Sequence, residues 1–422
     1  MSLRLLAAGP ALALLLVLAG CRVESPEPSA PDPEPAAQPE APSVPTDAVS
    51  MQGDDRLPSD ADVERDRYTG RSQSADVDTT GRGEAQRANP ERPAEIDSTT
   101  SWANRLHLPL GGDVEGPSVL KLQVLLDRAR FSPGQIDGRW GDNTEAALVA
   151  FQRDASLKPT GIVDAETARA LGERAGRPGQ LVVEHRLTAD DVAGPFRELP
   201  EDVYAKAELD ALGYESLGEK LGERFHAAPA LLQRLNDGAT LDSLKAGDTI
   251  RVPNVMGAPA IPGGVARLVV SGSGHSLQAL SNDGRVLFHA PATLGAGYDP
   301  SPSGQQTITG IARNPTWHYQ PALLSGVPDD GEDAVLPGGP NNAVGTVWMS
   351  LSKPHYGIHG TRAPGTIGYA SSSGCVRLTN WDAERLADAV RSGTTVEFRD
   401  IVGRGGEGGS SADSSRTSRT NA

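Results

Sequence analysis

The sequence has few cysteines, few aromatic residues and little positive charge. Only two cysteines occur among 422 residues, aromatic residues make up 4 %, and 55 acidic side chains outnumber 39 basic ones, giving a net charge of -16. The acidity argues against nucleic-acid binding, because the chain has no basic patch to neutralise phosphates. The eight histidines are scattered and form no His-Glu-x-x-His motif, so we expect no metal site and no cofactor.

The N-terminus has the features of a secretion signal. Arg4 precedes an apolar run from Leu5 to Leu18, which is too short for a comfortable membrane-spanning helix. The following Ala-Gly and Cys21 resemble the bacterial lipoprotein signal. This resemblance implies removal of residues 1–20, lipidation of Cys21 and, because Arg22 follows, an anchor in the Gram-negative outer membrane facing the periplasm. The alternative is an ordinary signal peptide with an incidental cysteine.

Lipidation of one cysteine leaves the other alone. Cys375 then has no disulfide partner in an oxidising compartment. A lone secreted thiol is either an inert buried side chain or a nucleophile.

Two stretches lack the patterning of a folded core. Residues 21–106 are rich in Pro, Ala, Glu, Asp, Ser and Thr without sustained apolar periodicity, which predicts a disordered acidic tether. Residues 401–422 are rich in Gly, Ser and Arg and are predicted to be a disordered tail.

Residues 107–178 show helical periodicity in three segments. Their apolar faces consist of Val119, Leu122, Leu125 and Leu126, then Ala147, Leu148 and Phe151, then Ala168 and Leu171. Asp142 with Glu145 predicts a capping box at the second helix, and Asp164 predicts the cap of the third. Through Leu122-Gln123, Ile136-Asp137-Gly138, Trp140-Gly141 and Phe151-Gln152, the segment resembles the three-helix peptidoglycan-binding module. Peptidoglycan binding is implied by that resemblance.

Residues 179–258 predict a smaller α+β module. Residues 216–225 and 229–236 indicate two short helices, and residues 249–252 indicate a strand ended by Pro253. Across Leu231 to Pro253 the module resembles a LysM glycan-binding domain. The first strand expected from this resemblance falls at residues 212–215, which match it poorly. Glycan binding and a packing role both remain open for this module.

In residues 264–400 the apolar periodicity becomes typical of β-strands. Short β-branched runs separated by Gly and Pro cover residues 265–270, 285–289, 306–311, 346–351 and 394–398. One amphipathic helix is predicted over residues 382–391. The pattern predicts a mainly β domain.

Two segments of this domain carry residues suited to covalent catalysis. Tyr356-Gly-Ile-His359-Gly-Thr ends one apolar β-run, and Ser372-Ser-Gly-Cys375-Val-Arg-Leu begins another. A thiol is a poor nucleophile until it is ionised, and a nearby imidazole can stabilise the thiolate as an ion pair. We expect neighbouring strand ends to bring Cys375 and His359 together, and backbone N–H groups near the thiol to form an oxyanion hole.

The same domain resembles the L,D-transpeptidase (YkuD-type) catalytic domain. The resemblance rests on motifs in the expected order: Ser301-Pro-Ser-Gly, Asn314-Pro-Thr-Trp, Gly339-Pro-Asn-Asn-Ala-Val-Gly-Thr, His359-Gly-Thr and Ser372-Ser-Gly-Cys-Val-Arg-Leu. It implies a mainly β, β-sandwich-like fold. It further implies that Cys375 is the nucleophile, that His359 is the general base, and that the carbonyl of Gly360 orients the imidazole.

The resemblance also implies a substrate-binding role for several neighbours of the pair. These residues are Tyr356, Thr361, Ser373, Gly374 and Arg377. A guanidinium matches a carboxylate in a forked geometry, so Arg377 is expected to pair with a substrate carboxylate or to brace the loop. Many relatives have His at the position of Ser373, which puts assistance from a second imidazole in doubt.

The implied reaction is an acyl transfer on peptidoglycan stem peptides. The thiolate attacks the amide after the third residue of a tetrapeptide, D-Ala leaves, and an amine resolves the acyl-enzyme into a 3–3 cross-link. Water as acceptor gives an L,D-carboxypeptidase, and a lysine of an envelope lipoprotein gives protein attachment. A competing possibility is a non-enzymatic tether between membrane and wall. Ser118-Val-Leu-Lys121 matches the Ser-x-x-Lys pattern of penicillin-binding proteins, but no Lys-Thr-Gly motif accompanies it.

Overall fold

The computed structural model describes residues 106–112, 114–297, 299–321 and 331–401. The predicted signal peptide, Cys21 and nearly all of the tether and the tail lie outside the described residues. Within the described ranges, every helix is too short or too polar to cross a bilayer.

The first folded module consists of three helices. They are α4 (Pro117–Arg128), α5 (Asp142–Asp154) and α6 (Ala165–Arg174), and their predicted apolar faces lie in or against one core. Asp164 caps α6 by accepting a hydrogen bond from Thr167 N at 2.8 Å, as predicted. The capping box at α5 is wrong: the N-cap is Gly141, and Asp142 lies in the first turn. There its charge is stabilised by the positive end of the helix dipole.

The second module is built from two strands and short helices. Its elements are β1 (Val182–Arg186), α7 (Val203–Ala207), α8 (Leu217–Arg224), α9 (Pro229–Leu235), the 3-10 helix η1 (Leu241–Ser243) and β2 (Thr249–Pro253). The two predicted helices and the strand are confirmed. The first strand is not at residues 212–215 but at β1, which pairs antiparallel with β2. Buried residues of this module and of the three-helix module form a single hydrophobic cluster.

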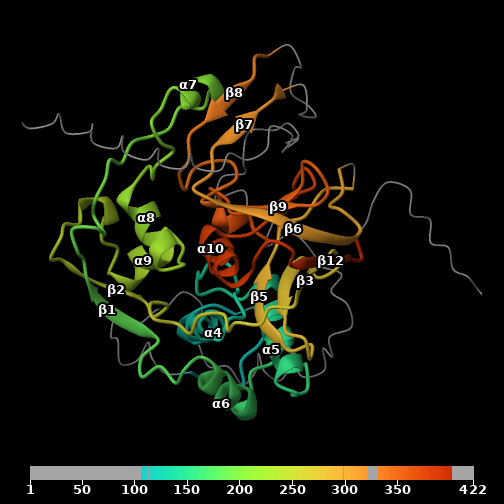
Figure 1. Ribbon diagram of the computed structural model, residues 1–422. Coiled ribbons are helices and arrows are strands. Elements are labelled where there is room, and N and C mark those ends of the chain that lie inside the picture. Colours follow the sequence, from blue (N-terminus) through green and yellow to red (C-terminus); the bar gives the residue numbers. More distant parts are fainter. Residues whose placement is uncertain (1–105, 113, 298, 322–330, 402–422) are drawn as a thin grey trace, which may run out of the picture. The chain divides into compact units, whose positions relative to one another are not determined.

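The third module is mainly β, as predicted. Its strands are β3 (Arg267–Ser271), β4 (Ser276–Leu280), β5 (Val286–Pro291), β6 (Gly304–Arg313), β7 (Trp317–Tyr319), β8 (Ala334–Leu336), β9 (Val347–Leu351), β10 (Gly357–His359), β11 (Val376–Arg377) and β12 (Thr395–Arg399). Among the described residues, eight of these form one sheet in the order β11-β10-β9-β6-β12-β3-β4-β5, while β7 and β8 pair separately. The strands follow one another from yellow to red in Figure 1.

The long strand β6 joins the two halves of the eight-stranded sheet. Its first residues pair with β12, and its last residues pair with β9. Leu268 and Leu277 from one half and Met349 and Ile358 from the other belong to one core, which also contains Leu386 of α10 (Asn380–Ala389). The two layers expected of a sandwich are therefore halves of one continuous sheet.

A buried polar network connects the three modules through α10. Asp127 of α4 accepts from His226 Nδ1 at 2.8 Å and lies 3.4 Å from Arg385 Nη1 of α10. Ser132 Oγ donates to Asp382 Oδ2 at 2.7 Å. Burial by itself would raise the pKa of Asp127, but the interactions with His226, Arg385 and Arg128 outweigh it and the pKa is lowered. The network fixes α10, which packs against β10 and against β9 (α10 and β9 are labelled in Figure 1).

Candidate active site

The two strands that carry the candidate pair are direct neighbours, as predicted. β10 and β11 are parallel, with Ile358 opposite Val376 and His359 opposite Arg377. Cys375 immediately precedes β11. Successive side chains along a strand point to opposite faces of the sheet. Because Ile358 and Val376 enter the core shared with α10, the side chains of Cys375 and His359 lie on the other face.

An aromatic platform holds the imidazole on that face. Trp348 of β9 is the cross-strand partner of His359, and the two rings stack with centroids 5.4 Å apart and an interplanar angle of 23°. The indole Nε1 donates to Ser350 Oγ at 2.9 Å, which fixes the tryptophan in turn. Cys375 belongs to the same apolar cluster as Trp348. The platform therefore both orients His359 and keeps water from the pair.

The hydrogen bond on one ring nitrogen determines the tautomer of His359. Nδ1 lies 2.7 Å from the carbonyl oxygen of Gly360. A carbonyl only accepts, so Nδ1 carries the proton and Nε2 keeps its lone pair. Burial, assisted by the charge of Arg377, lowers the pKa of His359 to about 3, although the bond to Gly360 opposes this shift. The ring is a neutral imidazole with a basic Nε2.

The thiol of Cys375 is also neutral. Burial raises its pKa to about 11; a hydrogen bond to the backbone of Gly357 and the charge of Arg377 lower the pKa in part, and Asp299 raises it. The Sγ donates to the carbonyl of His355 at 3.8 Å. The pKa shifts therefore favour a neutral thiol and a neutral imidazole over the expected thiolate–imidazolium ion pair, because burial penalises both charges.

The loop before Cys375 is fixed by short polar contacts and by one glycine. Ser372 Oγ donates to the carbonyl of Cys375 at 2.6 Å, and Ser372 N donates to Leu294 O at 2.8 Å. Gly374 has φ +90°, and a Cβ there would lie 2.6 Å from Cε1 of Tyr356. Ser373, which stands where many relatives have His, is buried in this turn. The turn thus requires glycine next to the thiol.

The predicted substrate-binding residues divide into two groups. Tyr356 and Arg377 lie beside the pair, and the Nε of Arg377 is buried without a hydrogen-bond partner among the described residues. Thr361 is instead bound to α10 through its backbone, where its N–H donates to Asn380 Oδ1 at 3.0 Å. Asn380 was not predicted from the sequence. The one sequence feature that could have indicated Asn380 is Thr379. Its side chain caps α10, which places Asn380 in the first turn of the helix.

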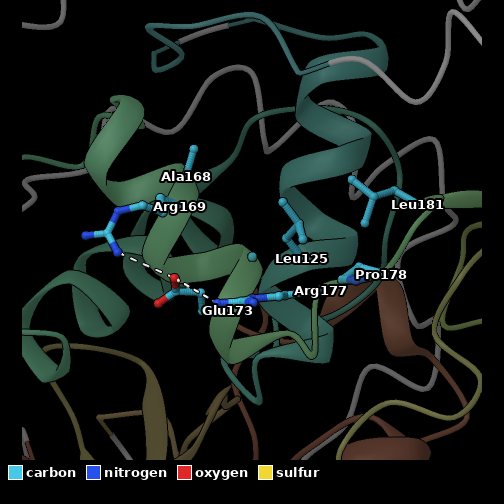
Figure 2. Close-up of a pocket in the computed structure, with 8 residues that line it drawn as sticks. Leu125, Ala168, Arg169, Glu173, Arg177, Pro178 and Leu181 are labelled. Atoms are coloured by element: carbon cyan, nitrogen blue, oxygen red, sulfur yellow. Dashed lines mark hydrogen bonds and ion pairs between the residues drawn. The ribbon is translucent and has the colours of Figure 1, made fainter.

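Within the described ranges, no group of three or more His, Cys, Asp or Glu side chains is arranged to hold a metal ion. A surface pocket lies elsewhere, lined by the three-helix module and by the start of the second module (Figure 2). Leu125 of α4, Ala168 of α6 and Leu181 line it. Glu173 pairs there with Arg169 at 3.5 Å and with Arg177 at 3.2 Å. This pocket contains none of the candidate catalytic residues.

Comparison with known proteins identifies two of the modules. Residues 266–398 match the YkuD family, described as the L,D-transpeptidase catalytic domain, and residues 115–171 match the putative peptidoglycan binding domain. Both resemblances predicted from the sequence are confirmed.

Three relatives carry the same family name. The putative L,D-transpeptidase YkuD of Bacillus licheniformis is 33 % identical over 43 % of this chain and 92 % of the relative. The protein of that name from Bacillus subtilis is 35 % identical over 41 % of this chain and 87 % of its own. The probable L,D-transpeptidase ErfK/SrfK of Escherichia coli is 30 % identical over 39 % of this chain and 53 % of its own. The chain belongs to the L,D-transpeptidase family.

Proposed function

We propose that this chain is a cysteine L,D-transpeptidase that remodels peptidoglycan, with Cys375 as nucleophile and His359 as general base. The observation that carries the proposal is that Cys375 and His359 lie on one face at adjacent strands, with Nδ1 of His359 bonded to the Gly360 carbonyl so that Nε2 keeps its lone pair. A neutral imidazole can accept the thiol proton as the sulfur attacks, so no resting ion pair is required.

The reaction proceeds in two halves. Sγ of Cys375 forms a bond to the carbonyl carbon of the third stem residue while Nε2 of His359 takes the thiol proton. The proton then passes to the departing nitrogen as the C–N bond breaks, releasing D-Ala and leaving a thioester. In the second half an acceptor amine attacks the thioester, His359 takes its proton, and the thiol is restored. The carbonyl of Gly360 keeps the ring in the required tautomer throughout.

Arg377 is proposed to bind a substrate carboxylate. Its Nε is buried and has no partner among the described residues, and burial lowers its pKa, so a bound carboxylate would compensate the desolvated charge. Tyr356 and the turn at Ser373 and Gly374 border the same face. The backbone N–H of Thr361 is already used by Asn380 of α10, so this residue is proposed to act on the substrate only through its side chain.

The other modules are proposed to hold the enzyme at its polymer. The domain matched at residues 115–171 supports peptidoglycan binding, and the pocket in Figure 2 is a candidate contact surface. The β1–α8–α9–β2 arrangement supports the LysM-like prediction for residues 179–258. A lipid on Cys21 would anchor the chain to the outer membrane in the periplasm, with the residues up to 106 as tether.

Product analysis tests this function and its alternatives together. The purified chain is incubated with disaccharide-tetrapeptides, and the products are identified by mass spectrometry. We expect a dimer that has lost one D-Ala. A tripeptide instead indicates L,D-carboxypeptidase activity, and attachment to an added lipoprotein indicates protein anchoring. If no D-Ala is released while the chain still binds peptidoglycan, the non-enzymatic tether is correct and the proposal is wrong.

A further inference from the structure

One peptide unit connects the candidate base to helix α10. The carbonyl of Gly360 accepts from His359 Nδ1 at 2.7 Å. The N–H at the other end of the same peptide, on Thr361, donates to Oδ1 of Asn380 at 3.0 Å. Because a peptide unit is planar and rigid, the side-chain amide of Asn380 controls the direction in which the Gly360 carbonyl points.

Every polar atom of the Asn380 amide is engaged. Oδ1 also accepts from Thr346 N at 3.2 Å, and Nδ2 donates to Pro340 O at 3.2 Å and to Glu223 Oε1 at 3.3 Å. A Cβ on Gly360 would collide with Oδ1. If the amide turned over, its NH₂ group would face the N–H of Thr361, donor against donor. The two acceptors on Nδ2 prevent this.

One of those acceptors comes from outside the matched catalytic domain. Glu223 lies in α8, which is upstream of residues 266–398 and packs beside α10 (Figure 1). The segment leading into α8 is attached to the catalytic module as well. Leu212 exchanges backbone hydrogen bonds with residues 338 and 341 and belongs to the apolar cluster of Cys375. Glu219 accepts from Asn341 Nδ2 at 2.7 Å.

We propose that Glu223 of α8 is a positioning residue that, through Asn380, holds the imidazole of His359. The smaller module is then part of the catalytic machinery in addition to any glycan contact it makes. The groups that face Glu223 are acidic or phenolic: Glu219 on its own helix, Glu384 on α10 and Tyr214. Burial, together with the first two, raises the pKa of Glu223. What Asn380 needs is therefore an acceptor oxygen, which glutamine also supplies.

The test compares four forms of the full chain: wild type, Glu223→Ala, Glu223→Gln and Glu219→Ala. The Glu219 variant is the matched control, since it removes a carboxylate one turn away that bonds to Asn341 rather than Asn380. With ¹⁵N-labelled histidine, NMR reports the tautomer of His359, and a His359→Gln sample assigns its signals. In Glu223→Ala we expect a second ring tautomer and a faster-exchanging Nδ1 proton. The Gln variant and the Glu219 control should keep the wild-type signals.

A second readout follows adduct formation at Cys375 with a carbapenem, which rests on the proposed function. We expect Glu223→Ala to be about three- to tenfold slower, the range for loss of one hydrogen bond, and Gln to restore the rate. If wild type forms no adduct, the proposed function fails, whereas the NMR signal still tests the positioning role. If the Glu223→Ala chain unfolds, Glu223→Met takes its place, because Met has a side-chain volume similar to that of Glu and lacks the acceptor oxygen. Wild-type tautomer signals in Glu223→Ala, or equal changes in the Glu219 control, overturn the proposal.

Discussion

Gly374→Ala should damage the turn beside Cys375 for two separable reasons. The first is backbone strain, because φ is +90° and an L residue at positive φ costs about 1–2 kcal/mol. The second is a collision, because the new Cβ would lie 2.6 Å from Cε1 of Tyr356. Overpacking of this kind costs about 1–3 kcal/mol. The expected loss in the free energy of unfolding is therefore about 2–5 kcal/mol.

Gly393→Ala is the matched control for this change. Gly393 has nearly the same φ, +88°, but nothing lies within 4 Å of a Cβ placed there. The free energy of unfolding of Gly393→Ala should fall only by the cost of backbone strain, about 1–2 kcal/mol. Urea denaturation followed by circular dichroism measures both variants, and carbapenem adduct formation should slow only in Gly374→Ala, where Tyr356 is displaced. Equal stability losses and equal adduct rates in the two variants would refute the steric reasoning.

Three further outcomes follow from the buried ionisable groups. At pH 8 a thiol with a pKa of about 11 is about 0.1 % ionised, so iodoacetamide should alkylate Cys375 about 100-fold more slowly than a thiol with the ordinary pKa of 9.0. Alkylation followed by intact mass should show the rate rising towards pH 11. A rate that reaches its plateau below pH 9 would contradict the raised pKa. Arg377→Lys should slow adduct formation about tenfold by losing the forked geometry, and an unchanged rate would exclude it from carboxylate binding. Asp127→Ala should lower the free energy of unfolding in urea by about 3–5 kcal/mol because Arg385 loses a buried partner. Asp388→Ala, which breaks an exposed ion pair, should change the free energy of unfolding little. Similar losses in the two variants would contradict the role of the buried pair.

Local patterns predicted the regular elements well. The β-branched runs at 306–311 and 346–351 lie within or overlap β6 and β9, and the two short helices of the second module are α8 and α9. The strand β1 was missed because its partner β2 lies beyond several helices, and only that pairing reveals the strand. Asp142 was misassigned because a capping box and an acidic first turn have the same spacing.

The candidate site was predictable in its residues and not in its electrostatics. Sequence placed Cys375 and His359 on neighbouring strand ends, and β10 and β11 are adjacent. The neutral state of both groups depends on burial against Trp348, which comes from a different strand. Asn380 escaped notice because its four hydrogen bonds join segments that are distant in sequence. Such a residue becomes visible only when those segments are brought together.

The most direct test of the central claim is the site of covalent modification by a carbapenem. The full chain is incubated with the drug, weighed intact, and mapped by peptide mass spectrometry alongside Cys375→Ala and His359→Gln. We predict one adduct per chain, located on Cys375, absent from the alanine variant and formed far more slowly in the glutamine variant. An adduct on any other residue, or an undiminished adduct in Cys375→Ala, would contradict the assignment of the nucleophile.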